Sequence, residues 1–199
     1  MVHHDFLRSR RSIRRFRPDD VPDSVIERIL STATFAPSAH NRQPWRFCVL
    51  KHPGPKSRLA DAMAAEFRRD LVADGVSEAE VITRTEQSRS RITSSPLVIV
   101  LCMDMSEMDV YPDASRNEAE RMMAIQSTAA AGLQLLLAVH AEGLAGVWTC
   151  GPLFAPQAVR DALYLDAAWE PQAMYFIGNP DQSPREKALK PLDSVVRMF

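Results

Sequence analysis

The chain has 199 residues, of which 46% are hydrophobic and 25% are charged, and its formal net charge is −1. This length and composition are those of an ordinary soluble protein, so we expect a single domain over residues 1–199. They exclude a disordered tail, a collagen and a disulfide mini-scaffold. A net charge near zero provides no overall field that attracts nucleic acid or an anionic membrane, so neither is expected as a partner.

Cysteine usage and the N-terminus indicate the cellular compartment. Cys48, Cys102 and Cys150 are widely spaced and form no Cys-x-x-Cys pair or Cys/His cluster, which predicts neither a disulfide framework nor a zinc site. The first five residues lack the apolar core of a signal peptide, and a reducing cytoplasm fits best. The most apolar stretch, residues 124–139, contains polar side chains and is shorter than the ~20 residues of a membrane span, so we expect a buried helix there.

Helical periodicity and turn residues predict a chain dominated by helices, with a few short apolar strands between them. The predicted helices span residues 22–36, 56–73, 77–91, 115–140 and 156–163. The predicted strands span residues 45–50, 96–103, 144–148 and 172–177. Ser-x-x-Glu capping boxes mark helix starts at Ser24, Ser77 and Ser115, with Pro22 as a competing start for the first helix. This pattern favours an α+β fold with helices packed on a mixed sheet.

Arginine is concentrated at the N-terminus, where it accounts for six of the first 17 residues. A guanidinium group binds phosphate through two parallel hydrogen bonds and keeps its charge in any environment. Arg10, Arg11 and Arg14, with the hydroxyl of Ser12, are therefore candidates for a phosphate site. The alternatives are a solvated basic arm and an arm that binds nucleic acid, although no aromatic and basic surface elsewhere in the chain would extend the latter.

A second polar segment, residues 36–45 (Ala-Pro-Ser-Ala-His-Asn-Arg-Gln-Pro-Trp), lies between a predicted helix end and a predicted strand start. Prolines stiffen it, and Ser38, His40, Asn41 and Gln43 supply hydrogen-bonding groups. Such a loop suits a heteroaromatic ring or a ribityl chain, whereas the alternative is an ordinary connection. Ser38 and His40 are too close in sequence to indicate a catalytic triad.

A third segment, residues 143–152 (Gly-Leu-Ala-Gly-Val-Trp-Thr-Cys-Gly-Pro), combines small residues with an aromatic one. Small residues let the backbone approach a planar ligand closely, and Trp148 offers a face for stacking. The segment is not a dinucleotide-binding Gly-x-Gly-x-x-Gly, and the chain contains no Walker sequence. Because no base lies near Cys150 in the sequence, we interpret this cysteine as a packing residue whose backbone matters.

Two charged regions remain. The basic tail, with Arg185, Lys187 and Lys190, either completes a phosphate site or is soluble surface. Acidic residues also cluster in the middle of the chain, but their spacing fits no EF-hand, so we expect a solvated loop and no metal site. These acidic residues are Asp104, Glu107, Asp109, Asp113, Glu118 and Glu120.

In order and spacing, the three segments resemble the nitroreductase-like family of flavoproteins, over nearly the whole chain. Residues 10–14 resemble the phosphate-binding signature of that family. Residues 37–45 resemble its P-S-x-x-N-x-Q-P-W loop, the most specific of the motifs. Residues 146–151 lie where the family places backbone against the flavin, and the basic tail matches its last phosphate contact.

The resemblance implies a nitroreductase-like α+β fold with a central mixed or antiparallel sheet flanked by helices. It also implies an obligate homodimer with exchanged C-terminal tails and two FMN sites at the dimer interface. One subunit would supply Arg10, Arg11, Ser12 and Arg14 to each site, and the other Pro37, Ser38, Ala39 and Asn41. The full implied set of cofactor-binding residues is Arg10, Arg11, Ser12, Arg14, Pro37, Ser38, Ala39, His40, Asn41, Gln43, Trp148, Thr149, Cys150, Gly151, Lys187 and Lys190.

The activity implied by the resemblance is transfer of hydride from NADH or NADPH through FMN to a small, electron-poor acceptor. The flavin carries the chemistry, helped by a backbone N–H near Cys150, and no side chain is expected to be an essential acid or base.

Three alternatives stay open. Residues 111–116 and 158–171 resemble the C-terminal flavin domain of bifunctional coenzyme F420:L-glutamate ligases, which implies reduction of a dehydro-F420 precursor. An oxygen-using, flavin-cleaving relative is the second alternative. A non-enzymatic nucleic-acid-binding module that uses the arginine arm is the third.

Overall fold

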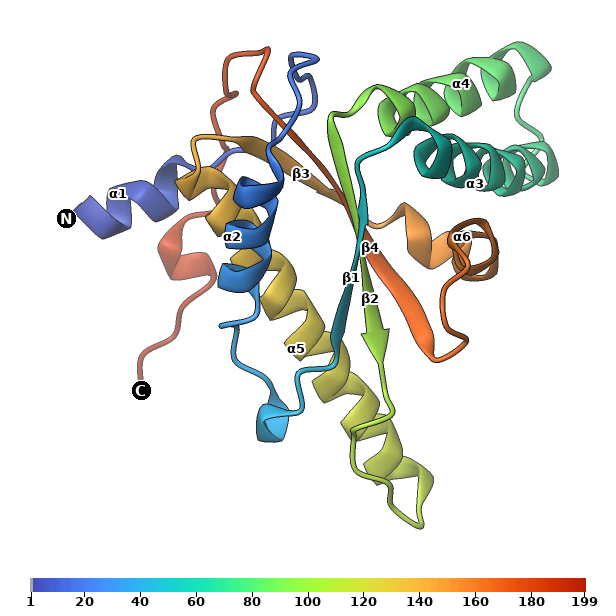
Figure 1. The fold of residues 1–199 in the computed structure, drawn as a ribbon. Coiled ribbons are helices and arrows are strands. Elements are labelled where there is room, and N and C mark those ends of the chain that lie inside the picture. Colours follow the sequence, from blue (N-terminus) through green and yellow to red (C-terminus); the bar gives the residue numbers. More distant parts are fainter. Residues whose placement is uncertain (1) are drawn as a thin grey trace.

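A four-stranded antiparallel sheet forms the centre of the computed structural model, which describes residues 2–199 (Figure 1). The strand order is β1-β2-β4-β3, and every pairing is antiparallel, so the predicted α+β fold is confirmed with an antiparallel sheet in place of a mixed one. All of β2 is buried, as its continuous apolar run predicts. The strands are β1 (Trp45–Leu50), β2 (Leu97–Asp104), β3 (Ala145–Thr149) and β4 (Trp169–Gly178).

Helices cover both faces of this sheet (Figure 1). Side chains of α2 (Asp23–Ala33) and α5 (Ala114–Ala141) form one apolar core with it. Side chains of α3 (Pro53–Ala73), α4 (Glu78–Ser94) and α6 (Pro156–Leu163) form a second core on the other face. The remaining helical elements are α1 (Val2–Ser9) and the short turns η1 (Ala39–Asn41), η2 (Gly151–Phe154) and η3 (Leu192–Ser194).

The helix starts differ from the predicted capping boxes at two of three positions. The Ser77 hydroxyl caps α4 by accepting a hydrogen bond from the backbone N–H of Glu80, as predicted. The predicted box at Ser115 is wrong, because Asp113 caps α5 and accepts from the Arg116 N–H at 3.0 Å. The box at Ser24 is also wrong, because α2 begins directly after Pro22 without a side-chain cap.

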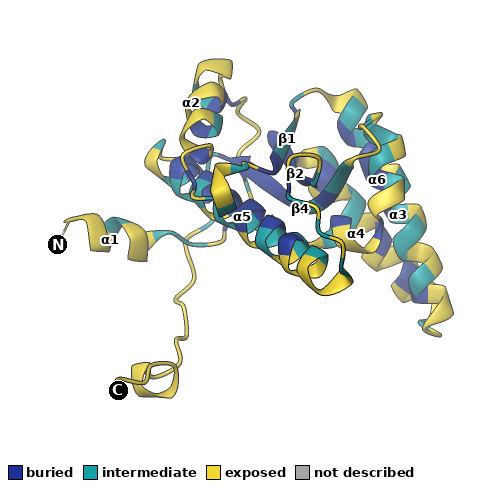
Figure 2. Cartoon of the chain, turned by 90° about the horizontal axis from the view of Figure 1, so that it is seen from below, coloured by how far each residue is buried: buried dark blue, intermediate teal, exposed yellow. Residues whose placement is uncertain are grey.

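Helix α1 was not predicted, because it has no buried residue and so leaves no core-facing pattern in the sequence. Figure 2 shows that α1 and the C-terminal tail extend from the body of the chain as exposed segments. From residue 183 onward every residue of the tail is exposed, including Lys187 and Lys190.

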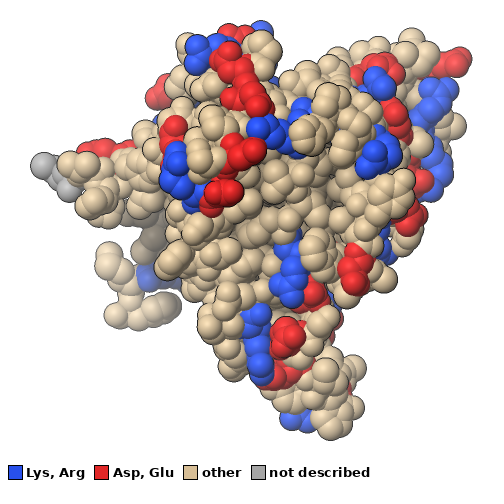
Figure 3. Space-filling view, in the orientation of Figure 1, with Lys and Arg blue, Asp and Glu red and all other residues tan. Residues whose placement is uncertain are grey.

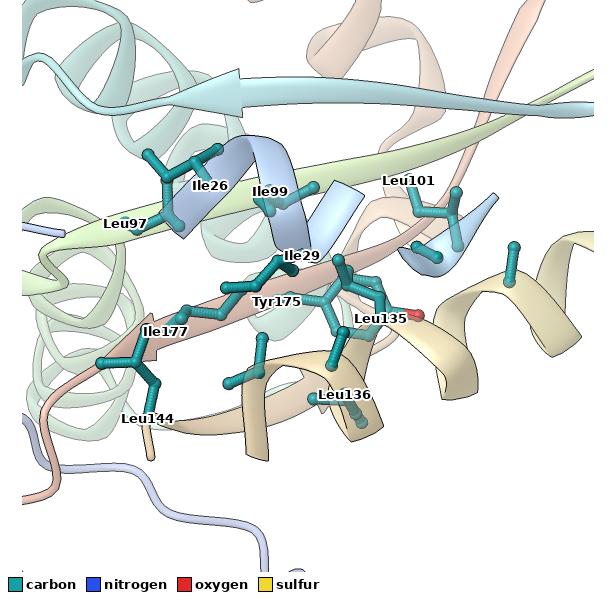
Figure 4. Packing of buried hydrophobic residues seen from close by; sticks show 14 of the residues in the cluster. Ile26, Ile29, Leu97, Ile99, Leu101, Leu135, Leu136, Leu144, Tyr175 and Ile177 are labelled. Carbon is teal, nitrogen blue, oxygen red and sulfur yellow. The ribbon is translucent and has the colours of Figure 1, made fainter. Parts of the chain in front are cut away.

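Helix α5 is long and apolar enough to cross a membrane by length and composition alone, yet half of its most apolar window is buried inside the protein. Figure 4 shows Leu135 and Leu136 of this helix packed with Tyr175 and Ile177 of β4. It is therefore the core helix that the sequence predicts.

Gly132 allows α5 to lie close to the sheet. A Cβ atom added there would overlap the hydroxyl of Tyr175 and come within 3.1 Å of side-chain carbons of Leu101 and Trp148. Tyr175 and Leu101 are completely buried and cannot swing away.

We expect Gly132→Ala to lower the free energy of unfolding by about 1–3 kcal/mol, the usual cost of inserting a methyl group into a filled core. Urea unfolding followed by circular dichroism measures the effect. Gly54→Ala, where the added Cβ meets only the end of the Arg58 side chain at 3.9 Å, is the matched control. An unchanged midpoint for Gly132→Ala would show that α5 has room to shift.

Candidate functional site

The first and third sequence segments lie side by side. Ser12 forms an isolated parallel bridge with Gly146, and the backbone N–H of Ile13 donates to the Gly146 carbonyl at 3.3 Å. β3 is an edge strand, so the N-terminal segment extends the sheet. This pairing carries the arginine-rich residues past the strand that leads to residues 148–151.

A cavity of about 630 Å³ opens between the sheet, α3 and α4. Thr149 and Gly151 line it from the end of β3, and Gln87, Ser88 and Arg91 line it from α4. The apolar part of the wall consists of Met63, Phe67, Leu71, Phe154, Ala155, Met174 and Phe176. Glu66, Asp70, Asp74 and Arg84 also line it, so its wall is both apolar and charged. Its volume is typical of a site for a small molecule or cofactor.

A smaller hollow of about 250 Å³ shares Arg91, Thr149 and Phe176 with this cavity. Arg14 and Arg15 line it from the N-terminal segment, and the hydroxyl-bearing residues Ser90, Ser94 and Ser95 line it from the end of α4. The smaller hollow is therefore rich in arginine and hydroxyl donors, with Asp181 as its one acidic residue, and the larger cavity combines an apolar wall with charged residues of both signs.

The residues of α4 are the part of the site that sequence reasoning missed. The 77–91 segment was predicted only as a polar helix. Gln87 and Arg91 are four residues apart and so lie on one helix face, but nothing in the local sequence says that this face borders a cavity.

Two buried donors that belong to the first and third segments, but line neither the cavity nor the hollow, have no hydrogen-bond partner among residues 2–199. They are Nη1 of Arg10 and the indole Nε1 of Trp148. Burying an unpaired polar group is costly, so each indicates an acceptor that the single chain does not supply. Next to Arg10, burial lowers the pKa of His140, and the positive charge of the arginine lowers it further.

The side chains predicted to bind the cofactor in the first and third segments are not all available to a ligand in this chain. Arg11 donates from Nη1 to the carbonyls of Arg8 and Arg10, so its side chain folds back over the end of α1. The hydroxyl of Thr149 donates to the Met174 carbonyl at 3.0 Å. Cys150 is exposed.

The second segment folds as a tight loop. His40, Asn41 and Gln43 all adopt positive φ angles of 49–54°. The Ser38 hydroxyl accepts from the backbone N–H of Gln43, and the Ala39 N–H donates to the hydroxyl of Ser127 on α5, both at 3.1 Å. The Ser38 hydroxyl is therefore used within the loop, and Ser127 fixes the loop to α5.

Helix α5 keeps the second segment away from the first. The loop is anchored at Ser127, whereas Ser9, next to the arginines, lies 2.8 Å from His140 near the other end of the helix. Thirteen helical residues span about 20 Å at 1.5 Å per residue. The chain thus pairs the first and third segments directly, whereas the second segment is anchored further along α5.

The region after β2 differs from the predicted solvated loop. Asp104 is 7% exposed and Glu120 only 2%, so the prediction is wrong for both. Burial alone would raise the pKa of Asp104, but hydrogen bonds from Ser106 and the nearby charge of Arg46 hold it below its usual value. Glu120 of α5 lies beside His40. The side chain of His40, which was predicted to bind the cofactor, therefore lies next to α5 of its own chain.

The tail begins beside the arginine-rich segment and then leaves it. The Asp181 N–H donates to the Arg15 carbonyl at 3.0 Å, and Phe16 bridges to Pro180. Within residues 2–199, Lys187 and Lys190 make no hydrogen bond or ion pair.

Comparisons with known proteins agree on one family. The family model described as "Nitroreductase family" matches residues 7–179. A Thermus thermophilus protein named NADH dehydrogenase is 28% identical over 94% of this chain and 91% of its own. A Bacillus subtilis protein that carries the name of an NAD(P)H nitroreductase is 28% identical over 96% and 91%.

Solved structures agree on the fold. A BluB-like flavoprotein from Clostridium difficile covers 100% of this chain and 99% of its own, with a TM-score of 0.81 and 21% identity. A nitroreductase-type protein of Desulfovibrio desulfuricans, solved in complex with FMN, covers 98% and 95%, with a TM-score of 0.74 and 24% identity.

We expect Ser127→Ala to loosen the loop of residues 37–44. The substitution removes the acceptor for the Ala39 N–H, and leaving this partly buried donor unpaired costs about 1–3 kcal/mol at most. Hydrogen exchange read by mass spectrometry should show faster exchange in this loop, while the sheet is unchanged. Ser115→Ala, at an exposed position of the same helix, is the control, and equal exchange in both variants would contradict the anchoring role.

Proposed function

Because this chain belongs to the nitroreductase family, we propose that it is an FMN-dependent oxidoreductase that passes hydride from NADH or NADPH to a small, electron-poor acceptor. The observation that carries the proposal is the space lined by Thr149 and Gly151, where three arginines surround the smaller hollow and the larger cavity has an apolar wall. The relatives named for NAD(P)H nitroreductase and NADH dehydrogenase support the nicotinamide reductant, and the fold relative solved with FMN supports the cofactor.

The residues present fit the chemistry of FMN. A phosphate monoester needs charged donors, and Arg10 has a buried Nη1 without an acceptor. Arg14 and Arg91 line the adjoining hollow and add positive charge. The flat apolar ring suits the wall made by Phe154, Met174 and Phe176. Ser12 and Gln87 are the donors that we assign to the ribityl oxygens and the polar edge of the ring.

When bound, FMN supplies the acceptance and release of hydride. The protein would hold and orient it: the backbone of Cys150 and Gly151 would lie against the ring with Thr149 beside it, and Trp148 would support the strand from the α5 side, where it packs against Tyr175. The Thr149 hydroxyl is already bonded to the Met174 carbonyl, which fixes its position. Cys150 acts through its backbone, so none of these side chains serves as a nucleophile or an essential acid or base.

The active form in this proposal is a homodimer. Pro37, Ser38, Ala39, Asn41 and Gln43 reach the cofactor of the partner subunit, because α5 holds them about 20 Å from their own arginine segment. Apolar side chains on the outer face of α5 support this assembly. Met122 and Leu133 are half-exposed, and Figure 3 shows a broad uncharged area on one face of the chain.

The tails exchange between subunits in the same proposal. Large apolar residues of the tail lie in solvent in the single chain and need a surface to cover them. These residues are Leu189, Leu192, Val195, Val196, Met198 and Phe199. Docking of the tail on the partner would bring Lys187 and Lys190 to a phosphate group. Small electron-poor molecules are the acceptors in this assembly, and the cytoplasm is its compartment.

The first test is the visible absorption spectrum of the purified protein, before and after addition of NADPH or NADH without oxygen. We expect flavin bands that bleach on addition of the nicotinamide and return when an electron-poor acceptor such as a nitroaromatic compound is added. A colourless protein that also fails to take up added FMN would overturn the proposal and favour the nucleic-acid alternative.

We expect Arg10→Ala to weaken FMN binding at least about tenfold, because a hydrogen bond to a charged group contributes about 1.5–3 kcal/mol. Titration of the flavin-free protein with FMN, followed by flavin fluorescence, measures the affinity. Arg8→Ala removes an exposed arginine two residues away and should bind FMN like the unchanged protein. If both variants bind equally, the phosphate does not lie at Arg10.

A further inference from the structure

Three ligand-type side chains from distant parts of the sequence meet beside the first half of α5. His40 comes from η1, Asp109 from the loop after β2, and Glu120 from α5 itself. The imidazole and the two carboxylates each offer one atom, and these atoms lie within 4.8 Å of one another. One nitrogen and two oxygen ligands are a donor set that divalent ions such as Zn²⁺ accept in proteins.

Glu120 provides an independent sign that a partner is missing. This residue is only 2% exposed, and its Oε2 has no hydrogen-bond partner among residues 2–199. Taking a carboxylate out of water without compensation costs several kcal/mol. A cation at the point toward which His40 and Asp109 also converge would satisfy the orphaned oxygen.

The surrounding charges leave room for a cation. Arg42 donates from Nη2 to a carboxylate oxygen of Asp109 and supplies one positive charge against the two carboxylates. With His40 neutral, the group keeps a net charge of −1. The arginine also orients Asp109, as groups behind a metal ligand commonly do. Arg46 is already paired with Asp104 at 2.9 Å.

The spacing requires only a small contraction. With metal–ligand bonds of about 2.0–2.2 Å, two ligands in a tetrahedral site are about 3.4 Å apart. Rotation of the three side chains would shorten the distances between their ligand atoms to this value, and the His40 side chain is exposed. Because His40 is exposed, the fourth coordination position of the metal would be open to a water molecule.

We propose that His40, Asp109 and Glu120 bind one zinc-type divalent ion per chain. The ion ties the loop of residues 37–44 to α5 and to the loop after β2. None of the three residues lines the cavity or the smaller hollow, so the role is structural: the ion braces the loop that reaches the other subunit's cofactor in the proposed function.

The test is zinc binding by the full-length protein without an affinity tag. The protein is stripped with a chelator, equilibrated with zinc sulfate and analysed for metal after gel filtration, and a chromophoric chelator measures the affinity by competition. We expect about one zinc per chain and a higher Tm with zinc present. Glu120→Gln and His40→Gln should each bind zinc at least about tenfold more weakly. Even the loss of a residue that only supports a metal ligand typically weakens metal binding by this factor.

Two control variants remove a carboxylate and an imidazole from exposed positions outside the proposed site. They are Glu118→Gln on α5 and His52→Gln before α3. Both should bind zinc like the unchanged protein. Flavin content, read from the visible spectrum of the same samples, reports separately on the redox site. Zinc uptake by a protein without flavin would therefore support this inference and not the proposed function.

Equal zinc binding by Glu120→Gln and Glu118→Gln would overturn the proposal, because it would indicate association with surface groups. Failure of the unchanged protein to take up zinc would overturn it as well. If Glu120→Gln does not fold, His40→Gln decides the outcome, since His40 is exposed.

Discussion

The packing of α5 against the sheet is the constraint on which the rest of the structure depends. The helix runs for 28 residues, and Gly132 allows close contact with Tyr175 of the central strand β4. The arginine-rich segment lies near its C-terminal end, and the loop of residues 37–44 is fixed by Ser127 in its N-terminal half. Because a helix of this length does not bend back on itself, the two segments are held apart within one chain. This separation is the geometric argument for the proposed dimer.

The edge strand β3 performs the other organising step. Its pairing with β4 sets the register of residues 145–149, and its free side accepts the backbone of Ser12 and Ile13. A single short bridge thus brings Arg14 and Arg15 beside Val147 and Thr149 of the strand that leads into Cys150, whereas Arg10 lies near His140. The Nη1 of Arg10 is buried and has no acceptor among residues 2–199. An unpaired buried donor is unfavourable, and the phosphate of the proposed cofactor would pair it.

Local sequence patterns predicted the elements well where burial alone decides them. The apolar run of β2 and the periodicity of α5 were read directly from the residues, and the three polar segments were found because their composition is unusual for connections. The helix caps at Ser24 and Ser115 failed because Pro22 and Asp113 lie nearby and compete for the same function. Gln87 and Arg91 were missed because only the packing of α4 against the sheet makes their face border a cavity.

The acidic region shows most clearly what composition cannot decide. A count of carboxylates between residues 104 and 120 is typical of a solvated loop, and Glu107 and Glu118 are indeed exposed. Yet Asp104 and Glu120 are buried, one paired with Arg46 and the other left with an unpartnered oxygen. What separates the two outcomes is the fold around them, since His40 and Arg42 arrive from a loop more than sixty residues earlier. Polar groups that are unremarkable in sequence therefore acquire a chemical environment through long-range packing, and in the proposed dimer the loop that reaches one subunit's cofactor would be braced by charges within the other.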